Sequence, residues 1–292
     1  MPDIVITEKN SLSVQRKAAK AKAFKRMRKA LRRAGAGTAP IDRLVVIPGS
    51  MKSGTTTLYE YLMQHPQIAP NEYSKEPSYF SGKKRSGPEY PLAYYFAQFA
   101  FDPAAHQYAL EASTNYMKYP SYSGAFAAMK ETGLDFRFIC ILRDPVDRAE
   151  SHIKHNIARG RLDFADYRKK LSRGPANTSK YATQIDQLLM HFPRESLLLL
   201  SFEALKADPS TSLQRTLDFL ELDDFSFAPP ERQNTRDITV DGRKWTFDDT
   251  DRDAVYRHVR DDIVRLEQEY QIPIQEWFPT FARLHSYASR AG

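Results

Sequence analysis

The chain has 292 residues, of which 41% are hydrophobic and 12% aromatic, so it can build a packed core and a wholly disordered protein is excluded. Its 43 Lys and Arg residues outnumber its 36 Asp and Glu residues, which gives a formal net charge of +7. One cysteine, Cys140, excludes an internal disulfide, and the spacing of the seven histidines matches no zinc motif, so we expect no metal site.

The positive charge is concentrated near the N-terminus. Residues 9–34 contain 11 basic residues and no acidic one, which leaves 32 basic against 36 acidic residues elsewhere. Small and apolar residues recur at helical spacing in this segment, and a linker containing glycine and proline follows it. We predict a basic helical extension and linker over residues 1–40, and one folded domain over residues 41–292.

The basic helix raises the question of a partner. Its apolar face is thin and mostly alanine, which fits a solvated helix, a subunit contact or an anionic surface better than deep membrane insertion. The sequence has no run of about 20 apolar residues, and its first ten residues lack the order of a signal peptide. We therefore expect a cytoplasmic protein without a nucleic acid partner, with peripheral contact to the inner membrane surface or a subunit through residues 9–34 as an alternative.

Apolar runs alternate with helical patterns along the rest of the chain. The predicted strands span residues 44–47, 108–111, 136–142 and 197–201, and the predicted helices span residues 56–65, 181–191 and 251–270. Continuous apolar strands that alternate with helices are typical of a parallel sheet covered on both faces. We therefore predict an α/β fold with three layers, in which helices flank a central parallel sheet.

The loop after the first predicted strand is the most informative segment. A loop between a buried strand and a helix presents backbone N–H groups and the positive helix end, which together bind a phosphate-like anion. Gly49 and Gly54 permit a tight backbone there. The spacing approaches the nucleoside triphosphatase pattern GxxxxGK[ST], but Thr55 stands where the lysine is required, and the lysine lies earlier, at Lys52.

A second anion-binding pattern follows the predicted strand over residues 136–142. Arg143 at the strand end offers a guanidinium fork to a phosphate, and Ser151 on the next helix is placed to donate to the same oxygens. Asp144 and Pro145 fit the cap and the first position of that helix. This pair suits a second phosphate group.

A third segment, residues 73–80, reads YSKEPSYF. Its carboxylate, Glu76, is chemically suited to take the proton of an attacking hydroxyl group. The plain alternative is that Lys75 and Glu76 are surface charges before a proline turn.

These three segments resemble the sulfotransferases that use 3′-phosphoadenosine 5′-phosphosulfate (PAPS). In that family a KxGTT-type loop binds the 5′ end of the donor, the RDP segment and its serine bind the 3′-phosphate, and the glutamate of a KEPxxF-type segment is the catalytic base. The resemblance runs from about Leu44 to Trp277 and implies a P-loop-like fold. It also implies PAPS as co-substrate, 3′-phosphoadenosine 5′-phosphate (PAP) as product, and no metal.

The resemblance implies in-line transfer of a sulfuryl group to a hydroxyl of a carbohydrate, lipid or other small acceptor. Glu76 and Lys52 are then the candidate catalytic residues. The candidate donor-binding residues are Lys52, Ser53, Gly54, Thr55, Thr56, Thr57, Arg143, Ser151 and Arg243.

The sequence departs from the family pattern at two places. Where members that modify glycans often read EKTPxY, this chain has Ala112 after Glu111, so the lysine that acts at the donor or acceptor site is missing. A late loop of KGR type corresponds here to Asp241, Gly242 and Arg243, so Arg243 is a candidate donor contact with Asp241 in the place of the lysine, and the alternative is a solvated turn.

Three other functions stay open at this point. A P-loop kinase-like phosphotransferase would bind ATP and magnesium, and the missing lysine after Gly54 argues against it. A catalytically silent nucleotide-binding protein on the same fold would bind PAP without transferring a group. A nucleic-acid-binding role would rest on the basic extension and would show a steep salt dependence.

Overall fold

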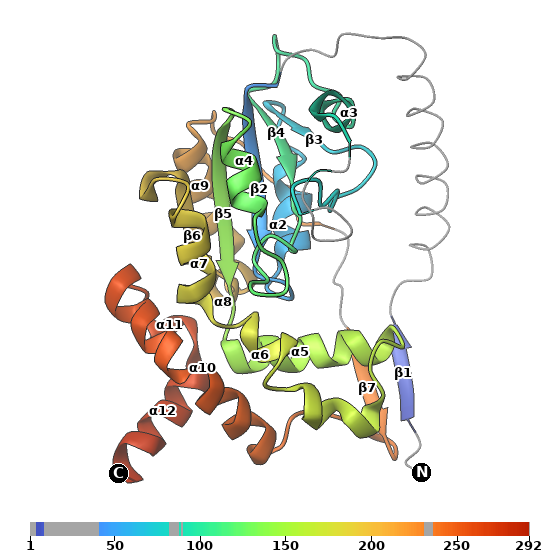
Figure 1. Ribbon diagram of the computed structural model, residues 1–292, viewed down its shortest axis with the longest axis vertical. Coiled ribbons are helices and arrows are strands. Elements are labelled where there is room, and N and C mark those ends of the chain that lie inside the picture. The colour runs from blue at the N-terminus through green and yellow to red at the C-terminus, as the bar shows by residue number, and fades with distance from the viewer. Residues whose placement is uncertain (1–3, 9–40, 82–87, 89, 231–235, 292) are drawn as a thin grey trace.

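A parallel sheet forms the centre of the fold (Figure 1). The computed structural model describes residues 4–8, 41–81, 88, 90–230 and 236–291. The strands, in their order across the sheet, are β3 (Ile68–Pro70), β4 (Tyr108–Glu111), β2 (Arg43–Gly49), β5 (Asp135–Leu142) and β6 (Leu197–Ser201), and all neighbours are parallel. The four predicted strands are confirmed, and β3 has no predicted counterpart because three residues carry no periodicity.

Side chains of the central strand alternate between two buried clusters. Val45 and Ile47 belong to the cluster on one face, and Leu44 and Val46 to the cluster on the other. The first face is covered by α2 (Thr55–Leu62), α8 (Phe202–Ala207) and α9 (Pro209–Leu220). The second face packs against α4 (Ala125–Lys130) and α7 (Tyr181–Leu189). The same buried cluster continues into α5 (Pro145–Ala158), α10 (Asp249–Tyr270) and α12 (Pro279–Ala291), which lie beyond the carboxyl end of the sheet (Figure 1). The predicted three-layer α/β fold is therefore confirmed.

Five shorter elements complete the described helices. They are α3 (Leu92–Phe96), the 3-10 helices η1 (Phe164–Lys170) and η2 (Arg194–Ser196), α6 (Gly174–Asn177) and α11 (Ile274–Trp277). Among the helices of the described residues, none combines the length and apolar composition that a bilayer span requires.

A second, antiparallel sheet lies beside the C-terminal part of α5 (Figure 1). Its strands are β1 (Ile4–Glu8), β7 (Arg236–Val240) and β8 (Arg243–Lys244), in the order β1-β7-β8. The sequence does not predict it, because β1 and β7 lie far apart along the chain and are short. Apart from residues 4–8, the predicted extension over residues 1–40 lies outside the described residues, so its helix, its role and the cytoplasmic location stay predictions.

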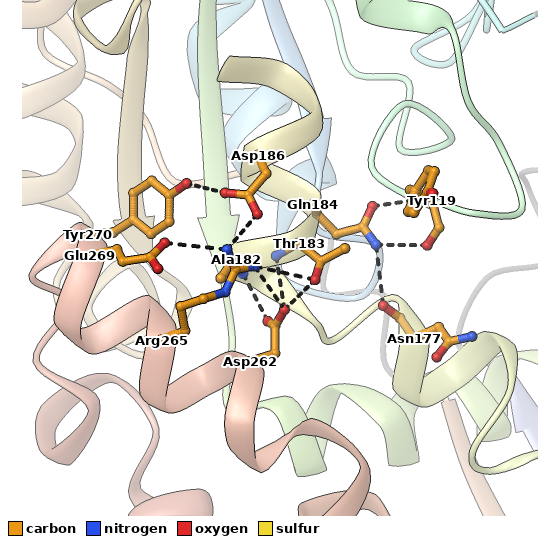
Figure 2. Close-up of polar contacts among 10 residues, drawn as sticks. All are labelled: Tyr119, Asn177, Ala182, Thr183, Gln184, Asp186, Asp262, Arg265, Glu269 and Tyr270. Carbon is orange, nitrogen blue, oxygen red and sulfur yellow. Dashed lines mark hydrogen bonds and ion pairs between the residues drawn. The ribbon is translucent and has the colours of Figure 1, made fainter. Parts of the chain in front are cut away.

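A carboxylate of helix α10 caps the N-terminal end of helix α7 (Figure 2). The residue before α7, Lys180, supplies no side-chain cap. Instead the Asp262 carboxylate of α10 accepts hydrogen bonds from the backbone N–H groups of Ala182 and Thr183, each at 2.9 Å. The first turn of a helix has unsatisfied N–H donors, so this carboxylate orients α7 on the sheet.

Helix α7 in turn fixes the chain that follows β4. The buried Gln184 side chain donates to the carbonyl of Tyr119 and accepts from its N–H, both at 2.9 Å (Figure 2). The same amide donates to the carbonyl of Asn177. Residue 119 and the backbone before it are thus held by a side chain that the core keeps in one orientation.

The last residue of β4, Glu111, is a fully buried carboxyl group. Its oxygens accept from the hydroxyls of Tyr95 at 2.9 Å, Tyr116 at 3.0 Å and Ser113 at 2.5 Å. Burial raises its pKa from 4.5 to about 7, although the three hydrogen bonds favour the ionised form. Loss of solvation therefore outweighs the hydrogen bonds.

We expect Asp262→Ala to lower the free energy of unfolding by about 1–2 kcal/mol, because two N–H groups of α7 lose their acceptor. Urea unfolding measures this change. Asp261→Ala is the matched control, since the neighbouring carboxylate is exposed and pairs with the adjacent Arg260. Equal losses in the two variants would show that the cap contributes nothing.

We expect Glu111→Gln to flatten the pH dependence of stability. Between pH 4.5 and 7 the unfolded chain releases this proton before the folded protein does, so wild-type stability falls as pH rises, by at most about 3 kcal/mol for this group. Burial also raises the pKa of Asp144 and Glu203, so part of the slope remains in the variant. Thermal unfolding from pH 5 to 8 tests this, with the exposed Glu131→Gln as control; parallel curves for Glu111→Gln and wild type would contradict it.

Candidate active site

The loop between β2 and α2 begins the site. Gly54 precedes α2 with φ 84, and Lys52 also has a positive φ of 72. The Ser50 N–H donates to the carbonyl of Ile141 in β5 at 2.8 Å, and the Ser53 N–H donates to the carbonyl of Ser50 at 3.1 Å. These bonds fix the loop against the neighbouring strand and give it a tight turn before the helix.

Two hydroxyl groups of this loop suit an anionic ligand. The Oγ atoms of Ser50 and Ser53 are buried, and within the described residues neither has a hydrogen-bond partner. A buried hydroxyl without a partner is costly unless a ligand or water satisfies it. Thr55 is buried at the first position of α2, while Thr56 and Thr57 are half-buried. The loop therefore fits the phosphate end of a nucleotide donor.

Arg143 lies directly against this loop. Its Nη1 donates to the carbonyl of Lys52 at 3.2 Å, and its guanidinium carbon lies 4.9 Å from the centre of the Phe202 ring. The next residue, Asp144, accepts from two N–H groups in the first turn of α5, as predicted for a helix cap. Ser151 follows on the same helix and is half-buried. The structure thus brings Lys52 and Arg143 together at the ends of two adjacent strands.

Arg148, a buried arginine that no sequence pattern singles out, is hydrogen-bonded to the loop between β2 and α2. Arg148 of α5 is fully buried, and its guanidinium donates to the carbonyl of Met51 at 3.3 Å, to the hydroxyl of Ser179 at 2.6 Å and to the carbonyl of Pro175. None of these three partners is a carboxylate. Burial lowers its pKa to about 10. The Arg148 guanidinium therefore adds positive charge next to the loop between β2 and α2.

Glu76 lies on the segment that follows β3. Its carboxylate is exposed, pairs with the Lys75 ammonium at 2.8 Å and accepts from the Thr114 hydroxyl at 3.4 Å. Lys75 also donates from Nζ to the carbonyl of Ala112 at 3.2 Å. The segment with Glu76 is therefore joined to the chain after β4.

Electrostatic interactions link α5 to the loop between β2 and α2 and to the chain after β4. Burial lowers the pKa of His152 well below its usual value, and the charges of Arg148, Lys118 and Lys52 lower it further. Burial also lowers the pKa of Lys118 to about 8, a shift that the carboxylate of Glu76 opposes. The charges of Lys52 and Lys118 thus both act on the imidazole ring of His152, which no sequence pattern marks because its environment depends on three separate segments.

Arg243 is placed apart from this group. It lies on β8, paired with Val240, and its side chain is exposed. The preceding turn, Asp241 and Gly242, has φ values of 48 and 74, as in a tight two-residue hairpin. The small sheet formed by β1, β7 and β8 lies beside the C-terminal end of α5, whereas Arg143 precedes the N-terminal end of that helix (Figure 1). A contact between Arg243 and the donor stays a prediction.

Comparison with known proteins agrees with this geometry. The sequence model of the family described as "Sulfotransferase domain" matches residues 42–241. Mouse heparan sulfate glucosamine 3-O-sulfotransferase 3B1 is 29% identical over 199 residues, which cover 64% of this chain and 48% of that protein. Mouse heparan sulfate glucosamine 3-O-sulfotransferase 3A1 is 30% identical over 200 residues, covering 64% and 47%. The chain spans about half the length of these curated relatives.

A solved structure supports the fold. A sulfotransferase from Alicyclobacillus acidocaldarius superposes with a TM-score of 0.62 at 23% identity, covering 82% of this chain and 99% of that one. The family model spans more than half of the chain and contains the β2–α2 loop, the Glu76 segment and Arg143. The family predicted from these three segments is therefore confirmed, and the chain belongs to the sulfotransferase domain family.

Proposed function

We propose that this protein is a PAPS-dependent sulfotransferase that transfers a sulfuryl group to a hydroxyl of a carbohydrate, lipid or other small acceptor. One observation carries the proposal: the loop bearing Lys52 is hydrogen-bonded to Arg143, and the charges of Lys52 and of Lys118, which interacts with Glu76, both act on His152. Because the mouse relatives are heparan sulfate glucosamine 3-O-sulfotransferases, we favour a carbohydrate hydroxyl.

The loop and α5 would hold the donor at its two ends. The residues assigned to the 5′ end are Lys52, Ser53, Gly54, Thr55, Thr56 and Thr57, which combine an ammonium, hydroxyls and the N-terminus of α2. Arg143 and Ser151 are assigned to the 3′-phosphate, for which a guanidinium fork is well suited. Arg243 is kept as a predicted further contact at the same end of the donor, although its strand lies beside the far end of α5.

Glu76 and Lys52 have separate roles in the proposed reaction. The acceptor oxygen forms a bond to sulfur while the bond from sulfur to the oxygen of the 5′-phosphate breaks. The acceptor proton passes to the carboxylate of Glu76, and PAP leaves with the electron pair of the broken bond. The ammonium of Lys52 stabilises the negative charge that grows on the leaving oxygen.

We expect Lys52→Met and Glu76→Gln each to reduce kcat by roughly 100-fold or more, because each removes one charge that acts in the transition state. Transfer of label from radioactive PAPS to a panel of oligosaccharides, hydroxylated lipids and phenols measures the rate. Glu72→Gln is the matched control, since this exposed carboxylate lies on the same segment. A Glu76→Gln variant with wild-type turnover would remove the assignment of the base.

We expect Gly54→Ala to weaken PAP binding at least about tenfold, equal to ~1.4 kcal/mol. An added Cβ would lie 2.8 Å from the Phe202 ring, at a φ of 84 that L residues rarely adopt. Gly133→Ala is the matched control, because its φ is also positive, at 72, but its Cβ would meet nothing within 4 Å. Calorimetric titration with PAP and with ATP measures both variants; tight binding of ATP by the wild type in place of PAP would favour a kinase.

A further inference from the structure

Lys118 stands at a fixed position on the chain that follows β4. The next residue, Tyr119, is held at both its N–H and its carbonyl by the buried amide of Gln184 (Figure 2). The Lys118 ammonium donates to Asn115 Oδ1 at 2.8 Å, and Asn115 Nδ2 donates to the Ser78 hydroxyl at 3.3 Å. Backbone and side chain are therefore both restrained, and the ammonium is directed toward the segment of Glu76.

The charges around Lys118 come from three elements. The segment after β3 contributes Glu76 and Lys75, and α5 and the chain beyond it contribute Arg148, His152 and Arg161. The pKa of His152 is far below its usual value, so its ring is neutral at pH 7. Among these groups Glu76 is the one anion, facing several cations. Such crowding of positive charge is unfavourable in the resting protein and becomes favourable when an anion enters.

The sulfonate of the donor is an anion that must occupy this region during the proposed reaction. The Arg148 guanidinium joins the two regions: Nη1 donates to the carbonyl of Met51, next to Lys52, at 3.3 Å and lies 3.4 Å from Nδ1 of His152. The charges of Lys118 and Lys52 both act on this same ring. Ala112, on the same segment as Lys118, has no charge to offer there. Lys118 is thus the residue of the chain after β4 that places an ammonium group near Glu76 and His152.

We propose that Lys118 is a further catalytic residue, whose ammonium contacts the sulfonate oxygens during transfer. This proposal rests on the proposed function. The contact strengthens as negative charge is redistributed over sulfonate and leaving oxygen, so it acts on kcat more than on donor binding. Because PAP lacks the sulfonate, its affinity does not depend on Lys118.

The test compares wild type with Lys118→Met, which keeps the length of the side chain, and with Lys118→Arg, which keeps the charge. At pH 7 we expect Lys118→Met to reduce kcat by roughly 100-fold with PAP affinity unchanged. The exposed Lys130→Met on α4 is the matched control and should retain wild-type kcat. A Lys118→Met enzyme within twofold of wild-type kcat would overturn the proposal.

The pH profile separates a charge that acts in the reaction from a residue that only supports the fold. Wild-type kcat/KM for PAPS, which reports the groups of the free enzyme, should decline above pH 8 as the ammonium, with its pKa of about 8, loses its proton. Lys118→Arg should keep its rate to higher pH, because a guanidinium stays protonated there. An unchanged alkaline limb in Lys118→Arg, or an Arg variant as slow as the Met variant, would overturn the proposal. If Lys118→Met does not fold, the profile of Lys118→Arg decides alone.

The same assay distinguishes failure of the proposed function. If the wild type binds PAP but transfers label to no acceptor, the sulfotransferase proposal fails, and the role of Lys118 fails with it. If the wild type transfers label and Lys118→Met does so equally well, only the role of Lys118 is rejected.

Discussion

The parallel order of four neighbouring strands is the constraint on which the site depends. In a parallel sheet all carboxyl ends lie at one edge, and ligands of open α/β sheets bind there. The chain leaves β3 toward Glu76, β4 toward Lys118, β2 toward Lys52 and β5 toward Arg143. Residues from four distant parts of the sequence therefore converge without any dedicated binding domain.

Burial of polar groups at this edge sets the chemistry of the site at a cost in stability. The carboxyl group of Glu111 and the guanidinium of Arg148 are fully buried, and loss of solvation is the largest cause of both pKa shifts. Each group is retained by several hydrogen bonds to neighbouring segments. The bonds that restrain these groups also fix the loops around them, so rigidity and desolvation have the same structural origin.

The sequence predicts those parts of the site that follow a strong local pattern. Lys52 lies in the loop after one apolar strand and Arg143 directly follows another, so their place at the carboxyl ends of the sheet follows from the strand order. Arg148 and His152 cannot be distinguished in the same way from exposed residues of α5, because their burial depends on chains packed against the helix. The small sheet is unpredictable for a similar reason: β1 and β7 pair across most of the sequence.

Lys118 is assigned to the site because of its position in space, and not because of its position in a sequence motif. The sequence has Ala112 where the resemblance to glycan sulfotransferases leads one to expect a lysine, which by itself suggests a missing charge. However, the chain returns toward the sheet at Tyr119, where Gln184 of α7 holds it, and this return carries Lys118 to the vicinity of Glu76. Helix α7 is oriented in turn by Asp262 of α10. The position of the Lys118 ammonium thus depends on the cap that Asp262 provides for α7. Asp262 belongs to the C-terminal part of the chain and lies far from the β2–α2 loop in sequence.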